Sequence, residues 1–340
     1  MRQQKYLLVK GTAGLGNRVF SLLTAILYAR LTRRRLLVDW SDTTYSSDGS
    51  NVVHQFFTSS HFSPYDEIPA TDSVRPAIWR GRLGESATAM CWTHAPKLIG
   101  HPLIWKRFSV GLSQLDYPEQ LLVMWTYFPL IDQLRRLFQG EFSPLRRLDT
   151  ETILRSLMHE SLELHPAIRE RVNGLRTSWP AKPTIGVHVR YMDKRTSLQA
   201  VCRKVDRLLA QHPGAQVFLA TDNQAVEELF ARTRPGLLTA PKWYPSAANS
   251  LHQLAACPDR FANGVEALTD LYLLAGCDYL VLNTRSAFSR LAGVLAEPER
   301  SRIYDLNQWR ALPPRTRHSL WLTSEFVKWA LRRFLARLRS

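Results

Sequence analysis

Alternation of short apolar strands with helical patterns is the feature that most constrains the fold of this chain. Near the N-terminus, an apolar stretch at residues 6–9 precedes a glycine-rich loop, a helical pattern over residues 17–32 and a second strand, "RLLVDW". A second series begins at Thr184 with "TIGVHV" and continues through "AQVFLATD", "DYLVLN" and "RIYDL", with helical patterns between them. Such alternation favours mostly parallel sheets covered by helices on both faces, which is the α/β class.

A long stretch of irregular pattern separates the two series. Residues 41–145 are rich in Pro and His and contain four tryptophans, Trp79, Trp92, Trp105 and Trp125. Core packing is the first expectation for each tryptophan, and stacking on a bound ligand is the second. The expected division is an N-terminal domain with this insertion, a linker, a C-terminal domain and a tail with a basic helix, at residues 1–165, 166–183, 184–310 and 311–340.

Composition indicates in which compartment the protein works and which classes of partner are disfavoured. The N-terminal apolar stretch is too short for a signal-peptide core, and no run of about 18 apolar residues occurs, so we expect a cytoplasmic protein. The four cysteines are scattered without a CxxC pair, which favours buried thiols over disulfides or zinc. The net charge is +16, but the cations are spread along the chain, which disfavours nucleic acid as a partner.

The C-terminal segment "SEFVKWALRRFLARLRS" has the pattern of a basic amphipathic helix. One interpretation is a helix that docks on the rest of the fold. The other is peripheral contact of residues 323–340 with an anionic membrane, at the inner face of the plasma membrane.

The stretch "IGVHVRYMDKRTS" places charged groups directly after an apolar strand. Ligands of open α/β sheets bind beyond the carboxyl ends of the strands. His188 and Arg190 lie at such an end, with Asp193 and Lys194 close behind. The planar guanidinium of arginine suits phosphate, so this cluster fits a diphosphate, including one that leaves in a reaction. The alternative is a solvated turn with salt bridges.

The first strand–helix turn, "KGTAGLGNR", is a second candidate site. Gly14, Gly16 and Asn17 lie where backbone N–H groups at a helix N-terminus can approach an anion. A dinucleotide fingerprint would have Gly or Ala where this chain has Val19, although Asp39 ends the next strand at a suitable distance for a ribose. An NAD-dependent oxidoreductase built on this unit is therefore the alternative enzyme class.

Three further residues are candidates for ligand binding. Asp222 ends the strand "VFLATD", Asp270 interrupts the apolar helix "ALTDLYLLA", and Ser286 opens a helix as an N-cap or as a phosphate ligand. The sequence has no Asp-x-Asp triplet, no HExxH motif and no Cys/His cluster. We therefore expect no metal and no cofactor.

Taken in order, these motifs resemble the fucosyltransferase superfamily, most closely the nodulation-type and core α-1,6-fucosyltransferases. "GVHVRYMDK" is similar to the first motif of the family, "VFLATDN" to the second, and "VEALTDLYLLAGCDYLVLNTRSAFSRLA" to the third. The N-terminal "GLGN" resembles the family's glycine-rich loop. Residues 41–182 show little similarity.

The resemblance implies a GT-B type fold, with two Rossmann-like domains whose parallel sheets face each other across a cleft. It also implies inverting, metal-independent transfer of fucose from GDP-fucose to a glycan. The acceptor would be a GlcNAc-type sugar of a bacterial surface or signalling glycan, linked α-1,6, with a lipid-linked glycan among the options.

The resemblance also assigns roles to the candidate residues. Arg190 would bind the β-phosphate and stabilise the departing GDP. His188 and Asp270 would lie beside the nucleotide, and Ser286 and the backbone at residues 16–17 would hold the diphosphate. The candidate catalytic residues are Arg190, Asp193, Lys194 and Asn17.

Two positions depart from the family pattern. Leu198 falls where core enzymes carry a Glu proposed as general base, and Tyr191 replaces a second Arg. The general base is therefore unassigned, with Asp193 as a substitute, and the donor could be another GDP-sugar. A catalytically inactive GDP-sugar or glycan-binding protein is the third interpretation.

Overall fold

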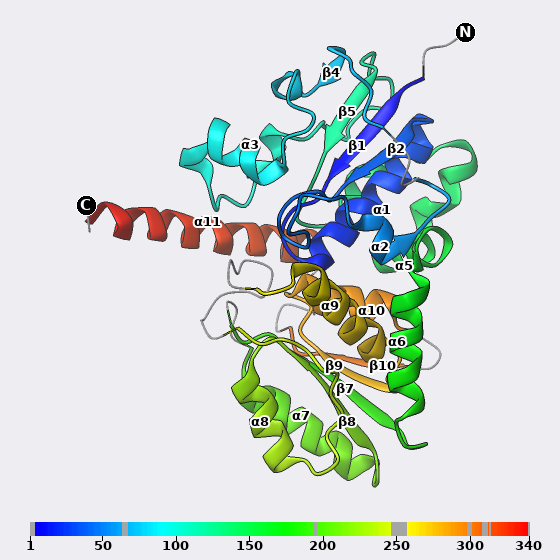
Figure 1. The fold of residues 1–340 in the computed structure, drawn as a ribbon, viewed down its shortest axis with the longest axis vertical. Coiled ribbons are helices and arrows are strands. Elements are labelled where there is room, and N and C mark those ends of the chain that lie inside the picture. Colours follow the sequence, from blue (N-terminus) through cyan, green and yellow to red (C-terminus); the bar gives the residue numbers. More distant parts are fainter. Residues whose placement is uncertain are drawn as a thin grey trace.

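The computed structural model describes residues 4–62, 67–192, 196–245, 257–297, 301–307, 312 and 314–338. Figure 1 shows two stacked α/β units, with a long C-terminal helix that leaves the molecule near the level where the units meet. Each unit is built around one four-stranded sheet, and within the described residues all pairings inside these two sheets are parallel.

The N-terminal sheet has the strand order β2-β1-β5-β4. Its strands are β1 (Tyr6–Lys10), β2 (Arg35–Asp39), β4 (Val74–Arg75) and β5 (Leu121–Met124). Helix α1 (Leu15–Thr32) connects the parallel strands β1 and β2, as a crossover between such neighbours requires. The predicted first strand–helix–strand unit is therefore present, and its helix begins two residues earlier than expected.

The C-terminal sheet has the order β10-β9-β7-β8. Its strands are β7 (Thr184–Val189), β8 (Gln216–Thr221), β9 (Tyr279–Leu282) and β10 (Arg302–Asp305). All six residues of β7 are buried, which is why its sequence is a nearly continuous apolar run. The two parallel sheets confirm the predicted fold class.

Helices cover both faces of the C-terminal sheet. On one side lie α7 (Leu198–Gln211) and α8 (Gln224–Thr233), and on the other side, toward the N-terminal unit, lie α9 (Arg260–Ala275) and α10 (Ala287–Leu295), as Figure 1 shows. Ser197 caps the N-terminus of α7, because its hydroxyl accepts a hydrogen bond from Ala200 N. The helix buries the stripe Val201, Val205 and Leu208. Its other faces are polar, as the spacing predicts.

The region of irregular sequence and the stretch after it, up to residue 164, contain mostly short elements. They are α2 (Val53–Phe56), β3 (Phe57–Thr58), α3 (Ala87–His94), α4 (Ile131–Leu134), α5 (Thr150–Ser161), β6 (Glu163–Leu164) and five 3₁₀ turns at Ala77–Trp79, Pro96–Leu98, Ile104–Arg107, Arg135–Leu137 and Gly140–Arg147. Trp79, Trp105 and Trp125 are buried, while Trp92 is exposed. Three of the four tryptophans are therefore core residues.

The stretch predicted as a linker contains α6 (Pro166–Thr177), with proline in its first turn. This helix packs against α9, and Trp179 just after it contacts Phe218 of β8 with ring centroids 5.0 Å apart. The connection between the two series is therefore attached to the C-terminal unit along most of its length.

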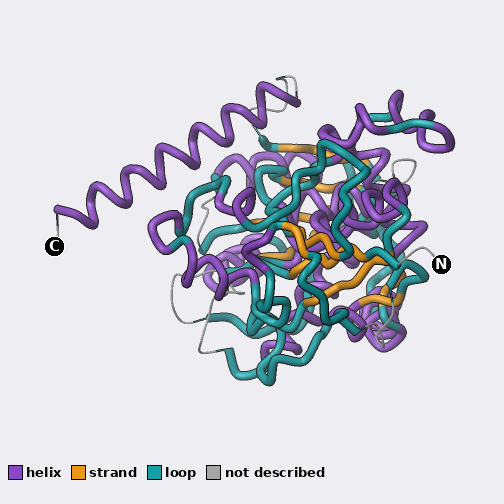
Figure 2. Tube along the Cα trace, turned by 90° about the horizontal axis from the view of Figure 1, so that it is seen from above, coloured by secondary structure: helices purple, strands orange, loops and turns teal. Residues whose placement is uncertain are grey.

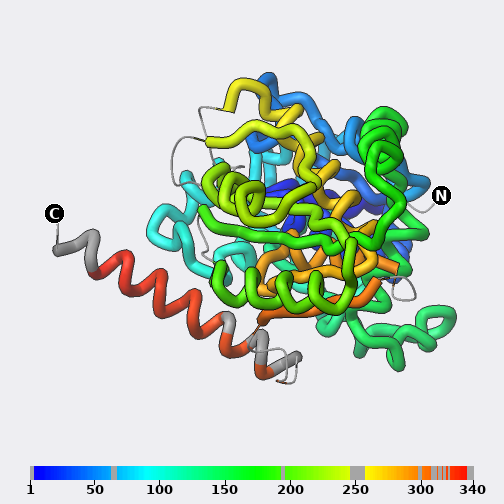
Figure 3. Tube along the Cα trace, turned by 90° about the horizontal axis from the view of Figure 1, so that it is seen from below, coloured from blue at the N-terminus to red at the C-terminus, as the bar shows by residue number. Residues whose placement is uncertain are grey.

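Helix α11 (Pro314–Leu338) projects from the body, which Figures 2 and 3 show from two sides. Trp329 Nε1 donates a hydrogen bond to Ile99 O at 3.1 Å, and the Trp329 ring meets the His101 ring edge-on at 4.8 Å. None of the helices in the described residues is both long and apolar enough to cross a membrane.

Candidate active site between the two sheets

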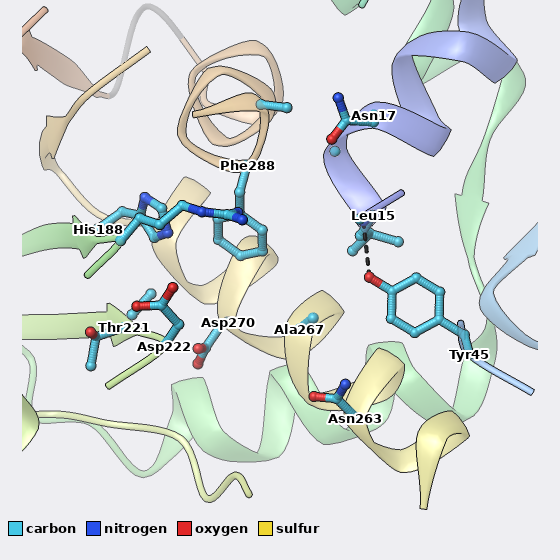
Figure 4. A pocket seen from close by; sticks show the side chains of 15 residues that line it. Leu15, Asn17, Tyr45, His188, Thr221, Asp222, Asn263, Ala267, Asp270 and Phe288 are labelled. Carbon is cyan, nitrogen blue, oxygen red and sulfur yellow. Dashed lines mark hydrogen bonds between the residues drawn. The ribbon is translucent and has the colours of Figure 1, made fainter. Parts of the chain in front are cut away.

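A pocket lies between the two units, at the carboxyl ends of β1, β7 and β8. Figure 4 shows its two walls. The N-terminal unit contributes Gly14, Leu15, Gly16, Asn17 and Tyr45, and the C-terminal unit contributes ten residues, namely His188, Arg190, Ala220, Thr221, Asp222, Asn263, Ala267, Asp270, Ala287 and Phe288. Ligand binding at the carboxyl edge is typical of α/β sheets.

Most of the predicted site residues meet in this pocket, although they come from distant parts of the sequence. Seven of them line it: Gly14, Gly16, Asn17, His188, Arg190, Asp222 and Asp270. Ser286 directly precedes two lining residues, but its own hydroxyl oxygen is buried without a hydrogen-bond partner in the described part of the chain. Asp193 and Lys194 lie outside the described residues.

The N-termini of α1 and α10 meet at the pocket. A Cβ atom on Gly16 would lie 2.6 Å from the backbone carbon of Ala287 and 2.8 Å from Phe288 N. Only glycine therefore allows the two helix starts to approach this closely. Because a helix N-terminus carries partial positive charge and N–H groups without intrahelical partners, the paired ends create a local environment that favours an anion.

The first turn of α1 is held by its neighbours. Leu15 N donates to Tyr45 Oη at 2.9 Å, the dashed line in Figure 4, and Asn17 N donates to Gly14 O at 3.0 Å. The Asn17 side-chain amide donates to Tyr127 O. The Asn17 backbone N–H and side-chain amide therefore hold the loop in place. The backbone N–H groups of residues 16 and 17 were both predicted to bind the diphosphate. Of the two, the Gly16 N–H has no acceptor among the described residues.

A buried arginine that sequence reasoning missed supports this loop. Arg18 pairs with Asp42 at 2.6 Å and donates to Ala13 O at 2.9 Å. Its guanidinium carbon lies 5.5 Å from the Trp40 ring centroid and 5.1 Å from that of Tyr45. In the sequence, Arg18 carries no signal beyond its place in "GLGNR", because its partners come from an irregular loop.

His188 is fixed on two sides. Its Nδ1 lies 2.6 Å from Ser289 Oγ, and its ring stacks on Phe288 with centroids 4.8 Å apart. Burial, together with the charges of Arg190 and Lys242, lowers the pKa of His188 to about 3. The imidazole is therefore neutral at pH 7, which suits a positioning or hydrogen-bonding role beside a ligand better than that of a cation.

The loop after β7 carries Arg190 into the pocket. Asp222 Oδ1, at the end of β8, accepts hydrogen bonds from Tyr191 N at 2.7 Å and Met192 N at 3.4 Å. Thr196 N donates to Arg190 O at 3.0 Å and closes the loop. Asp222 lines the pocket, and its Oδ1 also holds the backbone next to Arg190, while its predicted contact with a ligand stays a prediction.

Asp270 of α9 is buried in the pocket wall and pairs with Lys242, whose side chain is 4% exposed. Burial raises the pKa of Asp270 to about 6, although the charge of Lys242 acts in the opposite direction. Its Oδ2 is bonded to Lys242, and its Oδ1 is buried without a partner among the residues described. The carboxylate therefore retains an acceptor for a ligand. Lys242 was not predicted because its segment has no recognisable motif.

Asp39, the residue that kept the oxidoreductase interpretation open, is not among the residues that line this pocket. It pairs with Lys10 at 2.5 Å and accepts hydrogen bonds from Ser41 N at 3.0 Å and Ser41 Oγ at 2.5 Å. Although burial opposes this, Lys10 and Ser41 lower the pKa of Asp39 below its ordinary value. A carboxylate engaged in this way is not available to a ribose.

Comparison with known proteins identifies proteins that are similar to this chain. The family model described as Nodulation protein Z (NodZ) matches residues 148–312. Nodulation protein Z of Azorhizobium caulinodans is 26% identical over 329 residues, which cover 88% of this chain and 90% of that protein.

Solved structures agree. The crystal structure of fucosyltransferase NodZ from Bradyrhizobium has a TM-score of 0.63 at 21% identity and covers 89% of this chain and 96% of its own. A structure of NodZ α-1,6-fucosyltransferase soaked with GDP-fucose has a TM-score of 0.62 at 21% identity, with 90% and 96% covered. Together these matches confirm the predicted resemblance, and the solved structures confirm the GT-B fold.

Proposed function

We propose that this protein is an inverting glycosyltransferase that transfers fucose from GDP-fucose to a glycan acceptor. One observation carries the proposal: the N-termini of two helices meet at Gly16, in a pocket that Arg190 also lines. This arrangement suits a diphosphate, and the related α-1,6-fucosyltransferase was soaked with GDP-fucose.

The leaving group sets the electrostatic demand of the reaction. An acceptor hydroxyl attacks the anomeric carbon of fucose, the bond from that carbon to the β-phosphate oxygen breaks, and negative charge accumulates on GDP. Arg190 and the two helix N-termini lie where they stabilise that charge before and during bond cleavage. Positive groups that are already in place need little reorganisation in the transition state.

The nucleobase lies, in this proposal, against α9. Guanine presents two neighbouring N–H donors, and Asp270 offers a buried carboxylate oxygen without a partner in the described residues. Lys242 orients this carboxylate by holding its other oxygen. Leaving a buried acceptor unpaired is costly, so a base that supplies the donor gains affinity and one that lacks it does not.

The acceptor proton must pass to a base in an inverting reaction. Leu198, the first residue of α7, has no titratable group. We keep Asp193 as the proposed base, with Lys194 beside it near the fucose and the acceptor.

Transfer without a metal ion is part of the proposal, since Arg190 and the helix N-termini supply positive charge at the diphosphate. Transfer in excess EDTA is expected to match transfer with added magnesium. The proposed acceptor is a GlcNAc-type sugar of a bacterial surface or signalling glycan, attached to lipid in some forms. A cytoplasmic location with peripheral contact to an anionic membrane through residues 323–340 completes the proposal.

The first test is calorimetry with GDP-fucose, GDP, GDP-mannose, UDP-GlcNAc and NADH, on the parent protein and Arg190→Ala. We expect GDP-fucose and GDP to bind, and Arg190→Ala to lose about 10²–10³-fold in transfer rate with an unchanged melting temperature. Arg203→Ala, an exposed change on α7, serves as the control. Full activity of Arg190→Ala would refute the assignment, and GDP binding without turnover on any glycan would favour an inactive binding protein.

A further inference from the structure

Exposed apolar side chains are concentrated on α11. Among the described residues, seven large apolar side chains are strongly exposed, and five of these lie on this helix: Leu320, Phe326, Val327, Leu331 and Phe334. Val327, Leu331 and Phe334 are 58%, 55% and 59% exposed, respectively. Monomeric proteins rarely leave such a group of side chains in water without a use for it.

Four of these residues form one stripe along the helix. Positions 327, 331 and 334 are four and three residues apart, so their side chains share a face. Trp329 is on another side, where it contacts Ile99 and His101 of the body. Phe326 lies toward that side too, with its ring centroid 5.8 Å from that of His101. The contacts that hold the helix leave the other four side chains, here called the apolar stripe (Leu320, Val327, Leu331 and Phe334), open to the surroundings.

Basic residues dominate the rest of the helix. Between residues 314 and 338 the only acid is Glu325, against six cations: Arg315, Arg317, Lys328, Arg332, Arg333 and Arg337. Lys328 and Arg332 are exposed. At 100° per residue these two positions lie beside the apolar stripe, in the arrangement of helices that rest in the interface of anionic membranes.

We propose that α11 binds an anionic lipid bilayer, with the apolar stripe inserted between head groups and the flanking cations paired with lipid phosphates. Charge complementarity selects this occupant over a second copy of the chain. A second copy carries the same basic helix, and two such helices face to face would bring like charges together. A bilayer accepts both the apolar stripe and the positive charge.

Membrane binding through α11 rests on the membrane contact proposed above, and it can be tested independently of the transfer reaction. Trp329 and Arg333 tie the helix to residues 97–101, just after α3, which carries the exposed Trp92. Figure 1 shows that α3 lies on the same side of the molecule as α11. The helix therefore fixes which side of the enzyme approaches the lipid.

The test is flotation of the full chain with vesicles of phosphatidylcholine alone or with about one-third phosphatidylglycerol. We expect flotation with the anionic vesicles and little with the zwitterionic ones, and a decrease as salt rises, because each Lys or Arg near an anionic surface strengthens binding roughly fivefold. Val327→Asp with Leu331→Asp is expected to weaken binding at least about tenfold.

The matched control adds the same charge elsewhere. Gln211→Glu with Ala225→Asp changes exposed positions on or beside α7 and α8 and is expected to float like the parent. Calorimetry with GDP and melting temperature are expected to be equal for all three proteins, so a failed flotation does not bear on the donor site. A parent protein that does not float, or double variants that float equally, would overturn the inference. A concentration-dependent dimer abolished only by the stripe variant, without flotation, would assign the stripe to a second copy.

Discussion

At the scale of single residues, Gly16 has the sharpest structural requirement in the pocket. Its missing side chain is what allows the α1 backbone to meet the α10 backbone, because a Cβ at this position would lie only 2.6 Å from Ala287. Backbone atoms at this distance cannot move aside as the end of a flexible side chain can. The glycine pattern in "GLGN" was recognisable from the sequence, but its partner, 271 residues later in the chain, was not.

Gly16→Ala is therefore expected to push the two helix starts apart, lowering stability by about 1–3 kcal/mol and GDP affinity by at least about tenfold. Alanine is the better helix former, so any loss must come from the contact. Gly84→Ala is the control, because a Cβ there would meet none of the described atoms within 4 Å. Chemical denaturation and calorimetry measure both effects. An unchanged GDP affinity in Gly16→Ala would show that the approach of the helices does not form the diphosphate site.

In the proposed donor site, Asp270 is expected to make donor binding depend on pH. Only the ionised carboxylate accepts two N–H donors from guanine, and its pKa is raised to about 6. Affinity should therefore be highest above pH 6 and fall about tenfold between pH 7 and pH 5. His188, with a pKa of about 3, stays neutral over this range and does not contribute to the change of affinity with pH.

The ligand for this measurement is GDP-fucose, because its diphosphate is esterified at both ends and does not titrate near pH 6. Asp270→Asn is expected to bind more weakly at pH 7 and to show no fall between pH 7 and pH 5. A parent protein with equal affinity at both values would exclude the ionised carboxylate as the base-binding group.

At the scale of elements, the strand ends decide where the chemistry is placed. Beta strands β7 and β8 run side by side, and Asp222 at the end of β8 accepts the backbone N–H groups that follow β7. The strands and helices of this unit were predictable because each has a clear apolar period. The backbone just after Arg190 was visible only as the start of a cluster of charges, since its position depends on hydrogen bonds to Asp222 at the end of a neighbouring strand.

Asp222→Ala is expected to lower the transfer rate about 10–100-fold, because the backbone beside Arg190 loses its acceptor. Asp222→Asn should restore most of the rate, since its amide oxygen accepts the same two N–H groups. Steady-state kinetics on both variants separates this positioning role from charge. Equal loss in the alanine and asparagine variants would mean instead that the negative charge itself is required.

At the scale of the whole molecule, the pocket is formed by segments that are far apart in the sequence, and no sequence pattern indicates that they meet. Tyr45 and Lys242 could not be predicted, because neither belongs to a motif and each bonds a residue about 30 positions away in the sequence, Tyr45 with Leu15 and Lys242 with Asp270. The apolar face of the C-terminal helix was predictable, whereas the sequence alone allows that face either to dock on the body or to stay exposed. Its attachment through Trp329 required the structure.

Because both units line the pocket, a bound nucleotide is expected to stabilise the molecule as a whole. GDP at about 100 times its dissociation constant adds roughly 2.7 kcal/mol to the free energy of unfolding. For a chain of this length, the melting temperature should rise by about 3–4 °C. Differential scanning calorimetry with GDP, and with UDP as the control, measures this. A shift in only one part of a split transition would mean that the nucleotide contacts a single unit.

The close approach of the units has a consequence for dissecting the protein. Gly264 of α9 meets Phe56 so closely that a Cβ would lie 2.4 Å from its ring, and Phe56 stacks on Phe261 at 5.3 Å. The main apolar cluster runs from β1 and α1 into α9 and α10 without interruption. Cutting the chain between α6 and β7 would thus give two fragments, each with an exposed apolar face that is prone to aggregation. Neither would be soluble alone, and co-expression should let them reassemble by complementation, as halves of one cooperative unit rather than as independent modules.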